Sequence, residues 1–116
     1  MYSLRYHSIT ADTWFSRSKE FQLLNIASEL ARAQHWIENN RVDLVNSCYD
    51  RVLELVDLTR SDPQWKSGLR ELSRCREYLA GLRCAHIKDL SANRLLMRTL
   101  IQLNAKAERI FTGNNG

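Results

Sequence analysis

The stretch that decides the fold is RVDLVNSCYDRVLELVDLT, residues 41–59. Side chains suited to burial recur in it at spacings of three and four, the period of an amphipathic helix: Val45, Cys48, Val52, Leu55 and Thr59. Tyr49 and Val56 widen this face, as expected for a helix that is covered on more than one side. The stretch therefore predicts a central helix of a helical bundle.

Three further windows show the same period, at residues 18–38, 63–81 and 91–110. Gly68 is expected to interrupt the third helix after one turn, Gly81 to end it, and Ser91 to cap the fourth. Short connections such as Asn39-Asn40, which tolerates a left-handed turn, favour antiparallel neighbours. The expected fold class is all-α, an antiparallel up-and-down bundle of four main helices.

The two ends of the chain lack this period. Thr10 is expected to cap a short helix containing Trp14, and residues 1–17 are expected to form a lid over one end of the core. Residues 112–116 are expected to be a disordered tail. A chain of 116 residues is long enough for one hydrophobic core, so a single domain is predicted.

Composition excludes several classes of protein. Hydrophobic residues make up 44% of the chain and charged residues 26%, which is typical of globular domains rather than disordered or fibrous ones. No apolar run has the length of a membrane span, and the first residues lack the layout of a signal peptide. The odd number of cysteines, three, favours reduced thiols. A cytoplasmic protein without membrane association is expected.

Charge is distributed unevenly along the chain. Residues 1–59 carry six basic and eight acidic groups, a net charge of −2, whereas residues 60–116 carry eleven and five, a net charge of +6. This asymmetry is compatible with a face that binds polyanions, or with two halves that complement each other on folding or dimerisation.

Charged residues beside the apolar stripes form a first candidate site. Asn25, Glu29, Arg32 and Trp36 share one face of the first helix because their spacings are four, three and four. We expect six side chains to converge where the first three helices meet: Glu29, Arg32, Arg51, Glu54, Arg76 and Glu77. Such a network either sets the register of the helices or binds a ligand, in which case one group would stay unsatisfied beside a cleft.

Basic side chains on the last two helices form a second candidate. They recur at spacings of four and would make a joined surface for RNA or nucleotide phosphate: Lys66, Arg70, Arg74, Arg94 and Arg98. The other interpretation is a solvated face, paired in part with Glu71 and Glu77.

Catalytic constellations are missing from the sequence. Nothing in the sequence marks a Ser or Cys nucleophile paired with a histidine base, since His35 is expected on a helix and His86 in a connection, and no glycine-rich loop could cradle a phosphate. The Glu-x-x-His motif of di-iron bundles is absent, and Cys75, Cys84 and His86 lack the paired Cys-x-x-Cys spacing of zinc sites. No catalytic residue, metal ligand or cofactor is therefore expected.

Two resemblances add to this reading. Residues 51–59 and 69–77, RVLELVDLT and LRELSRCRE, resemble a group of small, uncharacterised bacterial all-helical proteins. Residues 31–55 look like the helical hairpin of the HEPN superfamily (higher eukaryotes and prokaryotes nucleotide-binding). The HEPN resemblance implies an up-and-down bundle of four or five helices, homodimers, and either RNA cleavage or partnership with a nucleotidyltransferase. The Arg that precedes His by four to six residues in the ribonuclease members is absent here.

These observations lead to two hypotheses of function. The first is a non-enzymatic helical interaction module, homodimeric, that binds a protein partner. The alternative is a HEPN-type RNA- or nucleotide-binding bundle that uses the five basic residues, as a partner of a nucleotidyltransferase. The dependence of RNA affinity on salt distinguishes them, because phosphate contacts weaken steeply as salt rises.

Overall fold

The computed structural model describes residues 10–113, and all the regular secondary structure in this range is helical. The elements are α1 (Ala11–Phe15), α2 (Lys19–Glu38), α3 (Val42–Arg60), the 3₁₀ helix η1 (Pro63–Gly68), α4 (Leu69–Cys84), α5 (Leu90–Ile101) and α6 (Ala105–Thr112). The predicted all-α class is confirmed. Within the described range no helix is both long enough and apolar enough to cross a bilayer.

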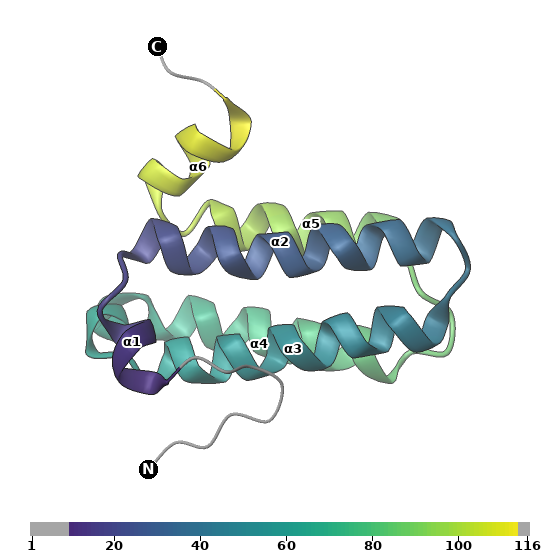
Figure 1. The fold of residues 1–116 in the computed structure, drawn as a ribbon, viewed down its shortest axis with the longest axis horizontal. Helices are drawn as coiled ribbons and strands as arrows, with labels where there is room; N and C mark the ends of the chain where they lie inside the picture. Colours follow the sequence, from purple (N-terminus) through teal and green to yellow (C-terminus); the bar gives the residue numbers. More distant parts are fainter. Residues whose placement is uncertain (1–9, 114–116) are drawn as a thin grey trace.

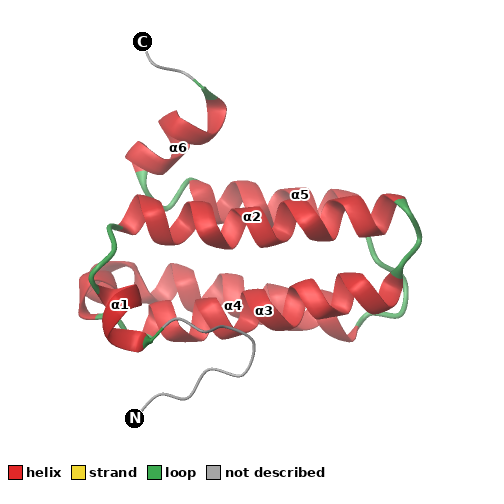
Figure 2. Ribbon diagram, viewed as in Figure 1, coloured by secondary structure: helices red, strands yellow, loops and turns green. Residues whose placement is uncertain are grey.

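The four longest helices lie in two layers, with α2 beside α5 in one and α3 beside α4 in the other (Figure 1). Helix α2 packs against both α3 and α5, and α4 packs against both α3 and α5. The short helix α1 covers one end of α3, and α6 stands out from the layers while contacting α2 and α5 (Figure 2). The core lies between the two layers.

Local signals place several helix ends where the sequence predicts them. The Thr10 hydroxyl accepts a hydrogen bond from the Thr13 amide at 3.2 Å and caps α1. Ser18 caps α2 in the same way. Asn40 has a φ of 57°, the left-handed conformation that lets α2 stop and the chain turn into α3.

The end of α4 differs from the prediction, because the helix continues past Gly81 to Cys84. Gly81 lies inside α4 and keeps helical geometry. The Lys88 ammonium satisfies free carbonyls at the true end, donating to those of Leu82, Arg83 and Ala85.

The predicted helix over 91–110 is also wrong, because the structure divides it into α5 and α6. Asp89, rather than Ser91, caps α5 by accepting from the Ala92 amide at 3.2 Å. Asn104 interrupts the pattern because its side-chain oxygen accepts from the Ala107 amide at 2.9 Å and starts a new helix.

The central stripe of residues 41–59 is buried as predicted. Its five positions and the two that widen it are all at most 3% exposed. Two tryptophan rings, Trp14 and Trp65, are each 2% exposed and close the core at the end where α1 and η1 lie. Of the predicted lid, residues 10–17 contain α1 with the buried Trp14, and residues 1–9 lie outside the described range. In the predicted tail, Thr112 belongs to α6 and Gly113 caps it, and residues 114–116 lie outside the described range.

One buried amide joins the elements at the tryptophan end. The Gln22 Nε2 group donates to the Trp14 carbonyl at 2.9 Å and to Asp62 Oδ2 at 2.7 Å. Its Oε1 atom accepts from the Trp65 indole at 2.7 Å, and the Trp14 indole donates to the Thr59 hydroxyl at 3.0 Å. The Gln22 side chain, which is 0% exposed, therefore holds α1, α2 and the α3–η1 junction together.

A second buried polar residue joins α5 to the same core. Asn93, 0% exposed, accepts from the Tyr49 hydroxyl at 2.8 Å and donates to the Leu30 carbonyl at 3.0 Å. Tyr49 lies on α3 and Leu30 lies on α2, so the two hydrogen bonds fix the position of α5 along both helices. Burial raises the pKa of Tyr49, which stays a neutral donor.

Replacement of Gln22 tests the importance of the amide. Gln22→Ala should lower the free energy of unfolding by about 2–4 kcal/mol, since it opens a cavity and leaves the Trp65 indole without a partner. The measurement is urea denaturation followed by circular dichroism. Gln102→Ala, at an exposed position, is the matched control and should change stability by less than about 0.5 kcal/mol. Equal effects of the two substitutions would contradict this account.

Candidate functional site

The six residues expected to form one network lie in separate groups. Glu29 on α2 is the centre of the first: it accepts from Arg51 of α3 at 2.9 Å and from Arg32 of its own helix at 3.1 Å. The Glu29 side chain is 13% exposed and that of Arg32 is 65% exposed. The ion pair between Glu29 and Arg51 is thus the half-buried one that links two helices.

Arg51 is held on two sides, because its Nη2 atom also lies 3.3 Å from the Cys48 sulfur. Burial opposes its charged form, but the hydrogen bond and the negative charge of Glu29 outweigh that effect and raise the pKa of Arg51. At Cys48 burial raises the pKa of the thiol, which disfavours a reactive thiolate.

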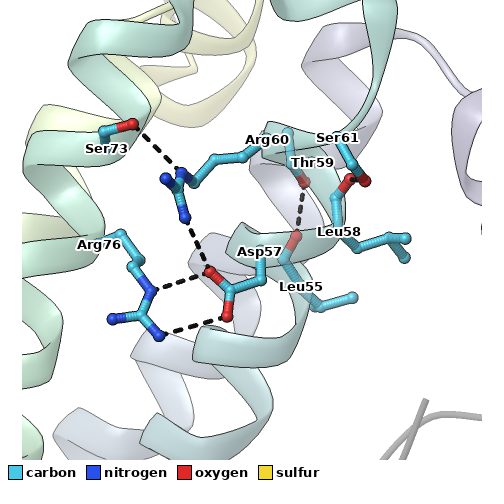
Figure 3. Close-up of polar contacts among 8 residues, drawn as sticks. All are labelled: Leu55, Asp57, Leu58, Thr59, Arg60, Ser61, Ser73 and Arg76. Carbon is cyan, nitrogen blue, oxygen red and sulfur yellow. Dashed lines mark hydrogen bonds and ion pairs between the residues drawn. The ribbon is translucent and has the colours of Figure 1, made fainter. Parts of the chain in front are cut away.

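Arg76 belongs to a second group, centred on Asp57 (Figure 3). Its guanidinium binds the Asp57 carboxylate through Nε at 2.9 Å and Nη2 at 3.4 Å. Arg60 contacts the same carboxylate at 3.2 Å and also donates to the Ser73 hydroxyl. The hydrogen bond to Asp57 and its negative charge raise the pKa of Arg76.

The remaining two of the six are Glu54 and Glu77. Glu54 lies half-buried on α3, and Glu77 is exposed on α4. No ion pair in the described part of the chain joins Glu77 to Arg32, Arg51 or Arg76. Glu29 and Arg51 pair at the contact of α2 with α3, whereas Arg76 pairs with Asp57 at the contact of α3 with α4, so the ion pairs of the predicted network belong to two different helix contacts.

The contact of α3 with α4 contains a ladder of charge pairs that sequence reasoning missed. Arg83 binds Asp50 through Nε at 2.7 Å and Nη2 at 3.4 Å, two turns along from the pair of Arg76 with Asp57. Asp57 lies two turns after Asp50 on α3, whereas its partner Arg76 lies two turns before Arg83 on α4. The two helices are therefore antiparallel, and the two ion pairs define a single register between them. Equal spacings of Asp on one helix and Arg on the other were the available signal.

The five predicted phosphate-binding residues are all exposed and none forms an ion pair within residues 10–113. Lys66 lies on η1, Arg70 and Arg74 on α4, and Arg94 and Arg98 on α5. Arg94 and Arg98 immediately precede the two α5 residues, Leu95 and Thr99, that turn toward α4. One residue along a helix is a rotation of about 100°, so these cations lie at the outer side of that contact.

A hollow of about 310 Å³ lies between α4 and α5, and we call it the α4–α5 groove. Its lining is mainly apolar: Glu71, Arg74, Cys75, Tyr78, Leu95, Leu96, Thr99 and Leu103. Leu95 is 55% exposed and Tyr78 is 41% exposed, so the rim contains large side chains that no part of residues 10–113 covers. The groove is at the lower end of the size range of ligand sites.

The groove extends toward the tryptophan end of the molecule. A second hollow of about 240 Å³ shares Glu71 and Leu103 with it and reaches Lys19, Trp65, Ser67 and Gly68. The Lys19 ammonium stands 5.0 Å from the centre of the Trp65 ring, a cation–π contact. Together the two hollows form a continuous depression along α4.

Chemistry in the groove is limited by its residues. Cys75 is 5% exposed, and burial raises the pKa of its thiol, so the thiolate is disfavoured. Among residues 10–113 no three side chains of His, Cys, Asp or Glu gather closely enough to hold a metal ion. Cys84 and His86, considered with Cys75 as zinc ligands, are exposed, whereas Cys75 is buried. The arrangement suits binding by apolar contact and by charge.

Sequence reasoning did not single out Leu95 or Tyr78. The periodic pattern over residues 63–81 includes Leu69 and Leu72 and predicts that both are buried, but Leu69 is 42% exposed. The available signal for the groove was Leu95 beside Leu96, since adjacent leucines on a helix cannot both point to the same side.

The charge ladder predicts unequal effects of two arginine replacements. Arg76→Ala and Asp57→Ala should each lower stability by about 1–2 kcal/mol, with a coupling of about 0.5–1 kcal/mol in a double-mutant cycle. Arg32→Ala is the control, because Arg32 lies outside the ladder, pairs with Glu29 and is 65% exposed, and it should cost less than about 0.5 kcal/mol. Urea denaturation of the four variants measures this, and a coupling of zero would mean that the ladder contributes nothing.

Comparison with known proteins provides no relative from which a function could be transferred. No protein-family model, no curated protein and no solved structure matches the chain. The assignment of function therefore depends on the α4–α5 groove and on the unpaired cations beside it.

Proposed function

We propose that this protein is a non-enzymatic interaction module that binds a protein partner through the α4–α5 groove. The observation that carries the proposal is the apolar lining of a groove whose rim exposes Leu95 and Tyr78. Exposed apolar surface bordered by polar groups marks sites of protein association, because covering it removes apolar area from water. Aromatic and apolar anchors of this kind dominate the energy of protein interfaces.

The proposed scaffold is an antiparallel up-and-down bundle of α2, α3, α4 and α5. The pairwise packing of these helices and the charge ladder between α3 and α4 support it. A rigid scaffold of this kind presents a groove whose walls do not need to fold on binding, which reduces the entropy lost in the complex. The three free thiols are suited to the reducing cytoplasm, where we place the module.

We also propose a homodimer, supported by α6. Its side chains Ile110 and Phe111 are 53% and 47% exposed, and α6 stands out from the two layers (Figure 1). Phe111→Glu should convert a dimer to a monomer in sedimentation velocity, because a buried unpaired charge is costly in an apolar contact. Ser47→Glu, at an exposed position of α3, is the matched control. A wild-type monomer at high concentration would exclude the dimer.

The alternative function is an RNA- or nucleotide-binding bundle of HEPN type. The observation that favours it is the set of five exposed cations without ion pairs in the described range. Binding through these groups would weaken steeply with salt on labelled RNA, since each phosphate contact releases counterions. The apolar lining of the groove favours the protein partner over this alternative.

Photo-crosslinking tests the protein-binding proposal. A benzoylphenylalanine placed at Tyr78 should form adducts with a defined protein in living cells, whereas the same group at Ser47 should not. The partner, once identified by mass spectrometry and purified, should bind the wild type at least about tenfold more tightly than Leu95→Asp, a difference of about 1.4 kcal/mol. Equal yields of adduct at the two positions would contradict the proposal, and so would a Leu95→Asp variant that binds the partner as tightly as the wild type.

A further inference from the structure

The charges around the α4–α5 groove are mostly of one sign. Arg74 and Lys19 line the two connected hollows, and Glu71 is the only acidic residue in either lining. Arg70 lies one turn before Arg74 on the same face of α4. Arg70 and Arg74 thus form a cationic border along the α4 wall of the apolar depression, and the α5 cations Arg94 and Arg98 are exposed on the outer side of α5.

We infer that the occupant of the groove is an amphipathic helix of a partner protein, apolar on one face and acidic along its flanks. This inference rests on the proposed protein-binding function and specifies the chemistry of the partner. Helix-in-groove recognition combines apolar anchors one turn apart with charges beside them.

The shape of the groove favours a helix. Two α5 side chains that line it, Leu95 and Thr99, lie one turn apart, about 6 Å along the helix axis, and Leu103 follows in the turn between α5 and α6. Opposite them, Glu71, Cys75 and Tyr78 recur on α4 at spacings of four and three. Two parallel rows with this repeat form the depression into which a ridge of a third helix fits.

The unpaired cations favour carboxylates on the partner. Within residues 10–113, Arg70, Arg74, Arg94 and Arg98 form no ion pair, so each guanidinium is open to a carboxylate in two-pronged geometry. Acidic side chains on the flanks of the helix would meet Arg70 and Arg74 along the α4 wall and would extend toward Arg94 and Arg98 on the outer side of α5. Such complementarity also excludes partners of the wrong charge.

A second copy of this chain fits the groove less well. Its exposed apolar helix, α6, carries Lys106 and Arg109 and only one acidic residue, Glu108. A basic helix beside a basic border would be repelled, so α6 is not the expected occupant. RNA would satisfy the cations but would leave the apolar rim at Leu95 uncompensated.

Peptide binding measured by fluorescence anisotropy tests the inference. The probe is a labelled helix of about 16 residues with Leu at i, i+4, i+7 and i+11 and Glu on both flanks. Two comparison peptides have Lys in place of Glu, or the same composition in scrambled order, and a single-stranded RNA of similar charge is the fourth probe. The acidic helix should bind the full-length protein at least about tenfold more tightly than the other three.

Matched variants locate the binding. Arg74→Glu and Leu95→Asp should each weaken the binding of the acidic helix about tenfold. Arg41→Glu, which makes the same charge change at an exposed position away from the groove lining, should change affinity by less than about twofold. Circular dichroism verifies that each variant folds, and Leu95→Ala replaces Leu95→Asp if that variant does not.

The outcomes separate this inference from the function on which it rests. Equal binding of the scrambled peptide, or RNA that binds as tightly and competes, overturns the acidic helix in favour of a general polyanion surface. Failure of the acidic helix to bind, while Tyr78 still crosslinks to a protein, overturns the inference and leaves the interaction module intact. If the acidic helix does not bind and Tyr78 does not crosslink to a protein, the proposed protein-binding function is overturned as well.

Discussion

The Gln22 amide, buried between two tryptophans and one carboxylate, is the interaction on which the rest of this structure depends. An amide with no access to water must place both donors and its acceptor in hydrogen bonds, so its partners can occupy only a narrow range of positions. Those partners belong to α1, to η1 and to the residue that caps η1, Asp62. One side chain thereby determines how the chain leaves α3 and enters α4.

The position of η1 has a direct effect on the groove. Gly68 caps α4, and a Cβ at this residue would come within 2.9 Å of the Trp65 ring, so the ring packs against a site that only glycine leaves open. Trp65 then forms part of the depression that continues the groove along α4. The contact between Gln22 and the Trp65 indole therefore links the buried polar cluster to the surface where we place binding.

The two faces of α4 are held in different ways. Toward α3 it presents Arg76 and Arg83, which pair with Asp57 and Asp50 and set one register. Toward α5 it presents Cys75 and Tyr78, which line a hollow rather than a closed contact. A helix anchored by charge on one side can leave an apolar depression on the other, because the ladder and the buried Leu72 and Leu79 already hold it in place. This asymmetry separates the structural charges of the protein from those available to a partner.

Periodicity in the sequence was sufficient to predict the helical class and the buried face of α3, because a spacing of three and four places side chains on one side of a helix whatever its neighbours are. The sequence also predicted the cap at Thr10 and a left-handed turn at Asn39-Asn40, which depend on local hydrogen bonds. It failed where residues outside the periodic pattern decide. Lys88, three residues after the C-cap of α4, donates to carbonyls at the end of that helix, and Glu29 and Arg76 belong to different contacts because α2 and α4 meet different faces of α3. The groove likewise required the tertiary structure, since only the packing of α4 against α5 shows that Leu95 and Tyr78 stay exposed while Leu96 and Cys75 are buried.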